Sequence, residues 1–129
     1  MLKPEIKQSL SNIVGPENFT DNLIDLVSYS SDASEHNHRP GGAIWVRNTE
    51  QVSAILKLAD EHKIPIIPRG AGTGLSGMAV PRKGGIVLDM SRMNKILKIS
   101  IEDRLAEVQP GVVYDHLEKA LAPYGYFFP

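Results

Sequence analysis

Cysteine is absent from this sequence, and its absence removes several kinds of chemistry. The chain has no disulfide framework, no thiolate nucleophile and no cysteine-ligated zinc or iron–sulfur centre. An excess of positive charge is also missing, because the formal net charge is −1 and Lys and Arg are scattered without a basic stripe. This balance gives no reason to expect nucleic acid or an anionic membrane as a partner.

Long apolar runs are missing as well. No run reaches 18 apolar residues, so no transmembrane segment is expected. The first seven residues also lack the apolar core of a signal peptide. We therefore expect a soluble, cytoplasmic protein, and 129 residues suffice for one domain with a modest core.

The chain does contain a regular order of helix and strand patterns. Apolar spacing predicts a helix over residues 4–14, a short helix after Thr20, a helix that begins after Asn48 and a final helix that ends before Gly125. Short apolar runs predict strands at residues 43–46, 64–67, 86–89, 96–99 and 105–108. This order predicts an α+β fold with a small parallel βαβ unit and an antiparallel strand pair, flanked by helices.

The same spacing predicts caps and core-facing side chains. We expect Thr20 or Asp21 to cap the short helix, and Asn48 to cap the third helix in a capping-box-like pair with Gln51. The side chains expected to face inward are Leu23, Ile24, Leu26 and Val27 in the second helix, Val52, Ile55, Leu56 and Ala59 in the third, and Val113, Leu117, Leu121 and Tyr124 in the last.

A glycine-rich stretch follows the strand predicted at residues 64–67. Residues 70–77, here called the glycine loop, hold four of the eleven glycines of the chain. Glycine tolerates positive φ and lets other groups approach the backbone closely. Consecutive amide N–H groups in such a turn can point inward and bind an anion, phosphate above all. The sequence therefore predicts an anion cradle at the carboxyl end of a strand.

The spacing of this loop excludes two common phosphate-binding turns. Gly72, Gly74 and Gly77 fit G-x-G-x-x-G, but Pro81 and the next strand leave no room for the helix of a dinucleotide-binding turn. No Gly-Lys-Ser/Thr follows, so a Walker loop is excluded too. The polar residues 28–42 are predicted to form a surface loop, in which His36 and His38 are far more typical of solvated side chains than of metal ligands.

The stretch IPIIPRGAGTGLSGMAVPRKGGIVLDMSRM, residues 64–93, closely resembles the pyrophosphate loop and next strand of FAD-linked oxidases. These are flavoproteins with the vanillyl-alcohol-oxidase-type, or PCMH-type, FAD domain. Within them the chain is most similar to the glycolate oxidase FAD subunit and to FAD-dependent D-lactate and D-2-hydroxyglutarate dehydrogenases. The resemblance extends through LAEVQPGVVYDHLEKALAPYGYFFP and covers about residues 25–129.

The resemblance implies FAD as the cofactor and assigns its contacts. Backbone amides of the glycine loop would bind the pyrophosphate, Thr73 and Ser76 would add hydroxyl donors, and Arg69 would add charge or brace the loop. An alternative for Arg69 is a surface arginine paired with a neighbouring carboxylate. Ala71 stands where many relatives have Gly, which the loop accepts if φ there is negative. The predicted cofactor-binding residues are Pro68, Arg69, Gly70, Ala71, Gly72, Thr73, Gly74, Leu75, Ser76, Gly77 and Pro129.

The resemblance also suggests that residues 1–129 are the N-terminal part of the FAD domain of a longer protein. Residues 1–27 would form N-terminal helices, and residues 28–129 a FAD-binding core truncated at its C-terminus. The whole protein would oxidise a 2-hydroxy acid to the 2-oxo acid, with iron–sulfur electron-transfer subunits or further copies of itself as partners. No catalytic residue and no metal ligand is assigned in this chain, and the chain alone is expected to be inactive.

Two other interpretations stay open. The chain could belong to another enzyme with the same domain, such as an alcohol, sugar or amine oxidase or a UDP-enolpyruvoylglucosamine reductase. It could also be a non-catalytic fragment that binds no flavin and only packs on partners. An exposed apolar surface near Phe127 and Phe128 would favour this last interpretation.

Overall fold

A computed structural model describes residues 2–129 and shows a mixed α+β fold, as the sequence predicts. The helices are α1 (Pro4–Val14), α2 (Leu23–Ser28), α3 (Thr49–Glu61) and α4 (Tyr114–Leu121), with 3₁₀ turns at Pro16–Asn18 and Ala122–Tyr124. The strands are β1 (Phe19–Thr20), β2 (Gly42–Trp45), β3 (Ile66–Arg69), β4 (Ile86–Asp89), β5 (Ile96–Ser100) and β6 (Leu105–Val108). The third strand thus begins two residues later than predicted.

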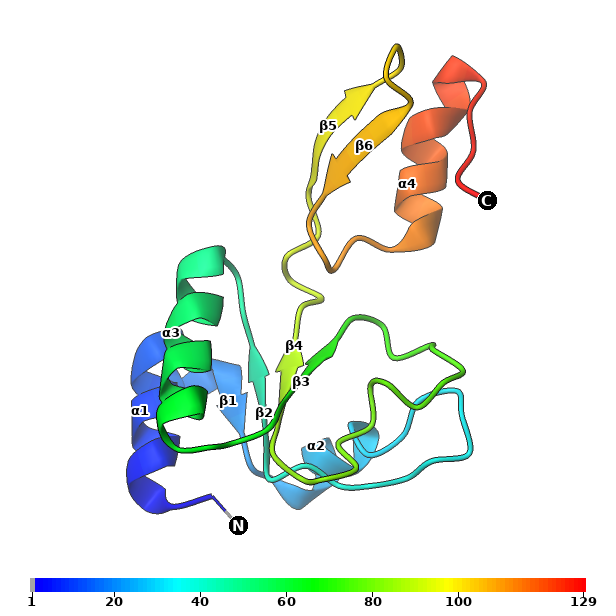
Figure 1. The fold of residues 1–129 in the computed structure, drawn as a ribbon. Coiled ribbons are helices and arrows are strands. Elements are labelled where there is room, and N and C mark those ends of the chain that lie inside the picture. Colours follow the sequence, from blue (N-terminus) through cyan, green and yellow to red (C-terminus); the bar gives the residue numbers. More distant parts are fainter. Residues whose placement is uncertain (1) are drawn as a thin grey trace.

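The larger sheet has the strand order β1-β2-β4-β3 within the described residues. Both β2 and β3 run parallel to β4, and β1 pairs antiparallel with β2 at the edge. The predicted parallel strand–helix–strand unit therefore exists, but β4 lies between its two strands. The glycine-rich connection from β3 to β4 crosses over without a helix, so it ends beside the strand from which it started (Figure 1).

The core of this sheet lies on both of its faces. On one face α1 and α3 cover Ile44, Ile86 and Leu88, together with the fully buried Ile55 of α3 (Figure 1). On the opposite face the side chains of Ala43 and Val87 pack against Leu26 of α2. The alternation follows from the two-residue period of a strand, which sends successive side chains to opposite faces. Residues 2–93, here called the N-terminal unit, therefore enclose their own core.

Helix α2 corrects one prediction. Of the four side chains expected to face inward only Leu26 is buried, whereas Leu23, Ile24 and Val27 are 58%, 79% and 56% exposed. Six residues form less than two turns, so a single position of this helix meets the sheet. Its N-cap is Asn22, whose side chain accepts from the Ile24 amide, and not Thr20 or Asp21.

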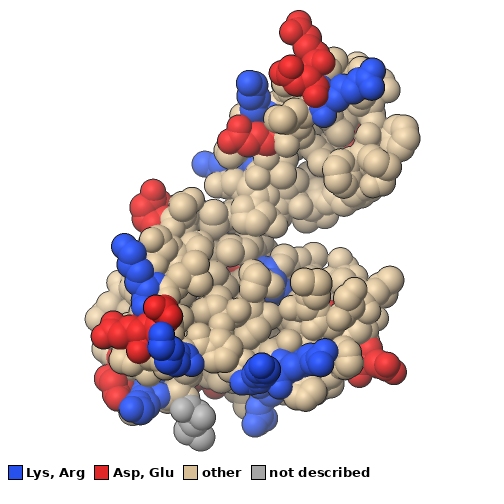
Figure 2. All heavy atoms as spheres, in the orientation of Figure 1, with Lys and Arg blue, Asp and Glu red and all other residues tan. Residues whose placement is uncertain are grey.

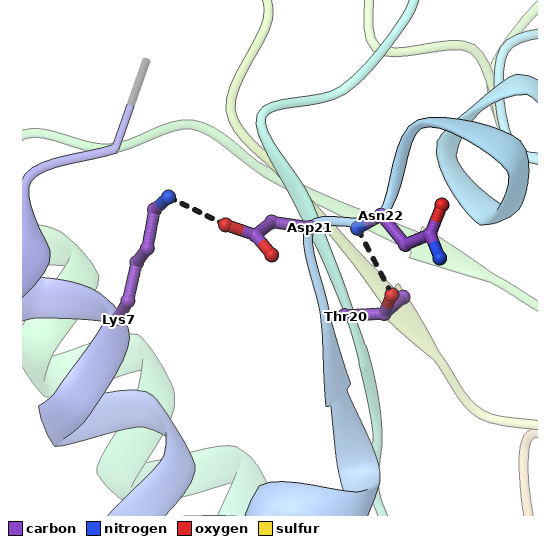
Figure 3. Close-up of polar contacts among 4 residues, drawn as sticks. All are labelled: Lys7, Thr20, Asp21 and Asn22. Atoms are coloured by element: carbon purple, nitrogen blue, oxygen red, sulfur yellow. Dashed lines mark hydrogen bonds and ion pairs between the residues drawn. The ribbon is translucent and has the colours of Figure 1, made fainter.

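The two residues wrongly predicted as caps have other contacts, shown in Figure 3. The Thr20 hydroxyl oxygen accepts a hydrogen bond from the Asn22 amide, at 3.2 Å. The Asp21 carboxylate forms an ion pair with Lys7 of α1, which ties the first helix to the segment before α2. Asn48 does cap α3 as predicted: its side chain accepts from the Gln51 amide, and Gln51 Oε1 in turn accepts from the Arg47 amide.

Residues 96–129 form a second part, the C-terminal unit, in which the hairpin of β5 and β6 lies beside α4 (Figure 1). Leu117 and Leu121 of α4 are buried, but Val113 and Tyr124, also predicted to face inward, are 46% and 56% exposed. An apolar groove of about 840 Å³ runs between the hairpin, α4 and the last residues of the chain. Its lining includes Leu105, Val108, Tyr114, Phe127, Phe128 and Pro129.

A close backbone contact at Gly111 joins the two units. The Gly111 amide donates to the Met93 carbonyl at 2.8 Å, and a side chain at position 111 would collide with the Met90 carbonyl. Glycine is the residue that permits such an approach. Among the helices of residues 2–129, none is long and apolar enough to cross a membrane.

Candidate functional site

The carboxyl ends of the parallel strands bring three side chains into one row. The register pairs Asp89 at the end of β4 with Trp45 of β2 on one side and with Arg69 of β3 on the other. The glycine loop begins directly after Arg69. Since ligands in sheets of this kind bind beyond the carboxyl ends of the strands, this edge is the candidate site.

Two residues of the glycine loop adopt the left-handed backbone that glycine permits. Gly72 and Gly77 have φ of +70° and +71°, a conformation that favours glycine, and a side chain at Gly74 would meet no atom within 4 Å. Within residues 2–129, no amide N–H of the glycine loop donates a hydrogen bond to another protein group. Most of the loop is solvent-exposed, so these donors are available to a ligand.

The loop supplies donors with little added charge around it. Figure 2 shows Lys and Arg side chains along the lower edge, at the left and on the upper part of the molecule, whereas much of the surface at the right is uncharged. Ala71 meets the condition set from the sequence, because its φ is not positive. Thr73 and Ser76 are exposed, and their hydroxyl groups have no hydrogen-bond partner among the described residues. The donor set fits a diphosphate held by backbone amides.

Arg69 points back into the protein. Its Nη1 donates to the Ser31 carbonyl at 2.8 Å, and its guanidinium carbon lies 5.5 Å from the centre of the Tyr29 ring. The guanidinium also fills the space where a side chain at Gly72 would lie. Within residues 2–129 it forms no ion pair with a carboxylate, so the alternative of a salt-bridged surface arginine does not hold. The bracing role foreseen for Arg69 matches these contacts.

Tyr29 connects this arginine to the end of β4. Its hydroxyl donates to Asp89 Oδ2 at 2.6 Å, and its ring meets Trp45 edge-on at 6.3 Å between centroids. Burial of the phenol, together with its hydrogen bond to Asp89 and the charge of that carboxylate, raises the pKa of Tyr29 far above its ordinary value of 10. Asp89 is itself buried, and its Oδ1 accepts from the Ser91 amide at 2.8 Å.

Residues 29–38, here called the flanking segment, pack against the glycine loop (the cyan and green loops at the right of Figure 1). The Ala33 amide donates to the Gly74 carbonyl at 3.1 Å, and the ring of His36 occupies the space beside Gly77. The sequence predicted only a solvated surface loop here. It gave no sign of these contacts because they join positions some 40 residues apart in the chain.

Pro129 lies elsewhere. It is exposed at the end of the C-terminal unit and lines the apolar groove with Phe127 and Phe128, apart from the glycine loop (Figure 1). The structure therefore brings together residues 68–77 of the predicted site but not Pro129, whose contact with the cofactor stays a prediction.

Within the flanking segment, the hydrogen bond from Ser34 to Asp32 lowers the pKa of the Asp32 carboxyl group.

Comparison with known proteins gives consistent relatives. The chain is 41% identical to the glycolate oxidase subunit GlcD of Bacillus subtilis, over 100% of this chain and 28% of that protein. It is 39% identical to the mitochondrial D-lactate dehydrogenase (cytochrome) of Kluyveromyces lactis, over 96% of this chain and 23% of that protein. The chain thus spans about a quarter of the length of the curated relatives that it matches.

Solved structures agree on the fold. A structure of p-cresol methylhydroxylase with bound substrate superimposes with a TM-score of 0.83 at 30% identity, over 94% of this chain and 24% of that one. A structure of alkyldihydroxyacetonephosphate synthase gives 0.82 at 24% identity, over 97% of this chain and 26% of that one, and supports the fold alone. The model of a family described as "FAD binding domain" matches residues 40–129. This chain therefore belongs to that family of FAD-binding domains, and FAD is its cofactor.

Proposed function

We propose that residues 68–77 hold the pyrophosphate of FAD and that residues 28–129 form the FAD-binding core of a longer oxidoreductase. The observation that carries the proposal is that, within residues 2–129, the amide N–H groups of the mostly exposed glycine loop at the end of β3 have no protein acceptor. A pyrophosphate needs several donors at once, and these amides supply them without a nearby cluster of basic side chains. Thr73 and Ser76 add hydroxyl donors at the same place.

For the whole protein we propose oxidation of a 2-hydroxy acid of the glycolate or D-lactate type to the 2-oxo acid. The support is the similarity to relatives named for those two substrates, at about 40% identity. FAD, when bound, supplies the acceptor of the hydride that leaves the substrate. The residues of this chain bind and orient it, and none is assigned to the chemical step. Partner subunits carrying iron–sulfur centres, or further copies of the chain, are part of the same proposal.

A second candidate is an oxidase for another substrate on the same domain. It is favoured by the likeness to p-cresol methylhydroxylase at 30% identity. Turnover assays of the whole protein with glycolate, D-lactate, D-2-hydroxyglutarate and p-cresol would separate the two. Activity with p-cresol alone would overturn the hydroxy-acid proposal.

Titration of the 129-residue chain with FAD, followed by flavin fluorescence, tests the cofactor site. Gly72→Val should weaken binding at least tenfold, because φ is +70° there and the new side chain would displace the Arg69 guanidinium. Gly84→Val is the matched control: its φ is also +70°, but it lies outside the glycine loop with open space around it. Thermal unfolding of each variant checks that it is folded.

The proposal predicts saturable binding by the wild type and by Gly84→Val. It would be overturned by a folded wild type that binds no FAD, or by Gly72→Val binding as tightly as the wild type. The first of these results would favour the interpretation of a fragment that binds no flavin.

A further inference from the structure

The flanking segment packs against the candidate cofactor site although the family match begins only at residue 40. Three contacts join it to the glycine loop or to the strand end that carries the loop. They are the hydrogen bond from the Ala33 amide to the Gly74 carbonyl, the hydrogen bond from Arg69 to the Ser31 carbonyl, and the packing of His36 beside Gly77. They meet the loop near its beginning, middle and end.

Such contacts matter because the loop has few hydrogen bonds of its own. Its amide N–H groups donate no hydrogen bond within residues 2–129, and it contains four glycines, the residue that loses most conformational freedom when it is ordered. A ligand that had to order the loop would lose part of its binding free energy in doing so. Bracing from outside reduces this loss, which is how preorganisation raises affinity.

The geometry of Arg69 distinguishes bracing from direct charge. Its guanidinium is occupied by the Ser31 carbonyl on one side, lies against the Tyr29 ring and fills the space beside Gly72. Tyr29 is in turn held by its hydrogen bond to the buried Asp89. These contacts use the planar shape of the guanidinium, which an ammonium group does not reproduce.

We propose that the flanking segment, acting through Arg69 and His36, fixes the conformation in which the amides of the glycine loop bind the pyrophosphate. Arg69 is then a positioning residue that braces the loop, and its charge is secondary. The inference rests on the proposed FAD site for its consequence in binding. The bracing itself is a property of the free chain and can be measured without any ligand.

The first experiment measures backbone ¹⁵N order parameters of Gly72, Gly74 and Gly77 in the free 129-residue chain. Arg69→Lys and His36→Ala should lower them from values typical of rigid backbone, about 0.85, to below about 0.6. His38→Ala is the matched control, because His38 lies in the same segment and its side chain is exposed. Unchanged order parameters in both Arg69→Lys and His36→Ala would overturn the proposal, whatever the chain does with FAD.

The second experiment compares FAD with riboflavin, which lacks the pyrophosphate. Arg69→Lys keeps the positive charge but loses the planar brace, so we expect at least a tenfold loss of FAD affinity with riboflavin binding unchanged. His36→Ala should act in the same direction, and His38→Ala should leave both affinities as in the wild type. If Arg69→Lys binds FAD like the wild type, Arg69 acts through its charge and the bracing role is wrong. A wild type that binds no FAD would refute the proposed function, and the order parameters would still decide the inference.

Discussion

The two units of this chain differ in how completely they bury their apolar side chains. In the N-terminal unit every residue of β4 is buried, because helices cover one face of the sheet and α2 covers part of the other. In the C-terminal unit Leu97, Leu105 and Val108 of the hairpin are 54%, 52% and 37% exposed. Phe127 and Phe128 are 72% and 52% exposed beside them.

The difference shows what each unit can do within the described residues. A parallel sheet with helices packed on it encloses a core, whereas a two-stranded hairpin is marginal by itself and depends here on packing against one short helix. The candidate cofactor site lies on the unit that has its own core, so the glycine loop is anchored to a rigid strand end. The exposed apolar groove was the feature expected for a partner-binding fragment, and it is present alongside the predicted anion cradle.

The largest expected effect compares one substitution in the two units. Leu88→Ala removes a side chain that is 1% exposed in the centre of the sheet, and should lower the free energy of unfolding by about 2–5 kcal/mol. Leu105→Ala, at a side chain that is 52% exposed, should cost under about 1 kcal/mol. Urea unfolding of both variants tests the contrast, and equal losses would show that the C-terminal unit has a core of comparable quality.

The joint between the units should be the next most sensitive point. Gly111→Ala places a methyl group against the Met90 carbonyl, and the displaced backbone should cost about 1–3 kcal/mol. Limited proteolysis should then cut between residues 93 and 112 faster than in the wild type. Gly125→Ala gives a control, since it has open space around it although its φ is +72°. An unaltered cleavage pattern in Gly111→Ala would argue against a tight joint.

Substitutions at the helix caps should change the free energy of unfolding less, and in opposite directions in the two units. Asn48→Ala removes the side-chain cap of α3 and should lower the free energy of unfolding by about 1 kcal/mol. Helix α4 begins after Val113 without a side-chain cap, so Val113→Ser should stabilise it by up to about 1 kcal/mol. Both values can be read from urea unfolding midpoints, and a loss of stability in Val113→Ser would contradict the capping argument.

The smallest expected effect on stability comes from Tyr29. It is absent at neutral pH and appears only in alkaline solution. The folded state holds the pKa of Tyr29 above the value of 10 that it has in an unfolded chain. Above pH 10 the unfolded chain has therefore lost a proton that the folded chain keeps, so stability should fall as pH rises. Tyr29→Phe should show a shallower loss of unfolding free energy above pH 10 than the wild type. If the wild type and Tyr29→Phe lose unfolding free energy equally steeply above pH 10, the raised pKa belongs to another of the four tyrosines.

Local patterns predicted most of the elements and the position of the glycine loop. The cap at Asn48 and the turn glycines depend on residues that are neighbours in the chain, which sequence spacing can describe. The insertion of β4 between β2 and β3 could not be predicted in this way, because strand order depends on contacts between distant segments. The exposed face of α2 was missed for the same reason, since an apolar pattern does not reveal how few residues of a short helix reach the sheet.

The candidate site likewise has one part that local sequence patterns predict and one part that depends on contacts between distant segments. Residues 68–77 were predicted from glycine spacing and from resemblance to a family. The resemblance covered the flanking segment, but the contacts of Ser31, Ala33 and His36 with the loop were missed because they arise only once the sheet has formed. A tyrosine and an arginine 40 positions apart give no signal of stacking in a single sequence.

The position of Pro68 has a consequence for self-association. Strand β3 forms the outer edge of the larger sheet, and the Arg69 carbonyl accepts from Met90 on the β4 side. The backbone nitrogen of Pro68, the preceding residue, therefore points to the free edge, where it cannot donate. This edge resists the addition of a strand from another molecule, a route by which exposed sheet edges aggregate. The hairpin of β5 and β6 contains no proline, so its strands lack the protection that Pro68 gives to the β3 edge.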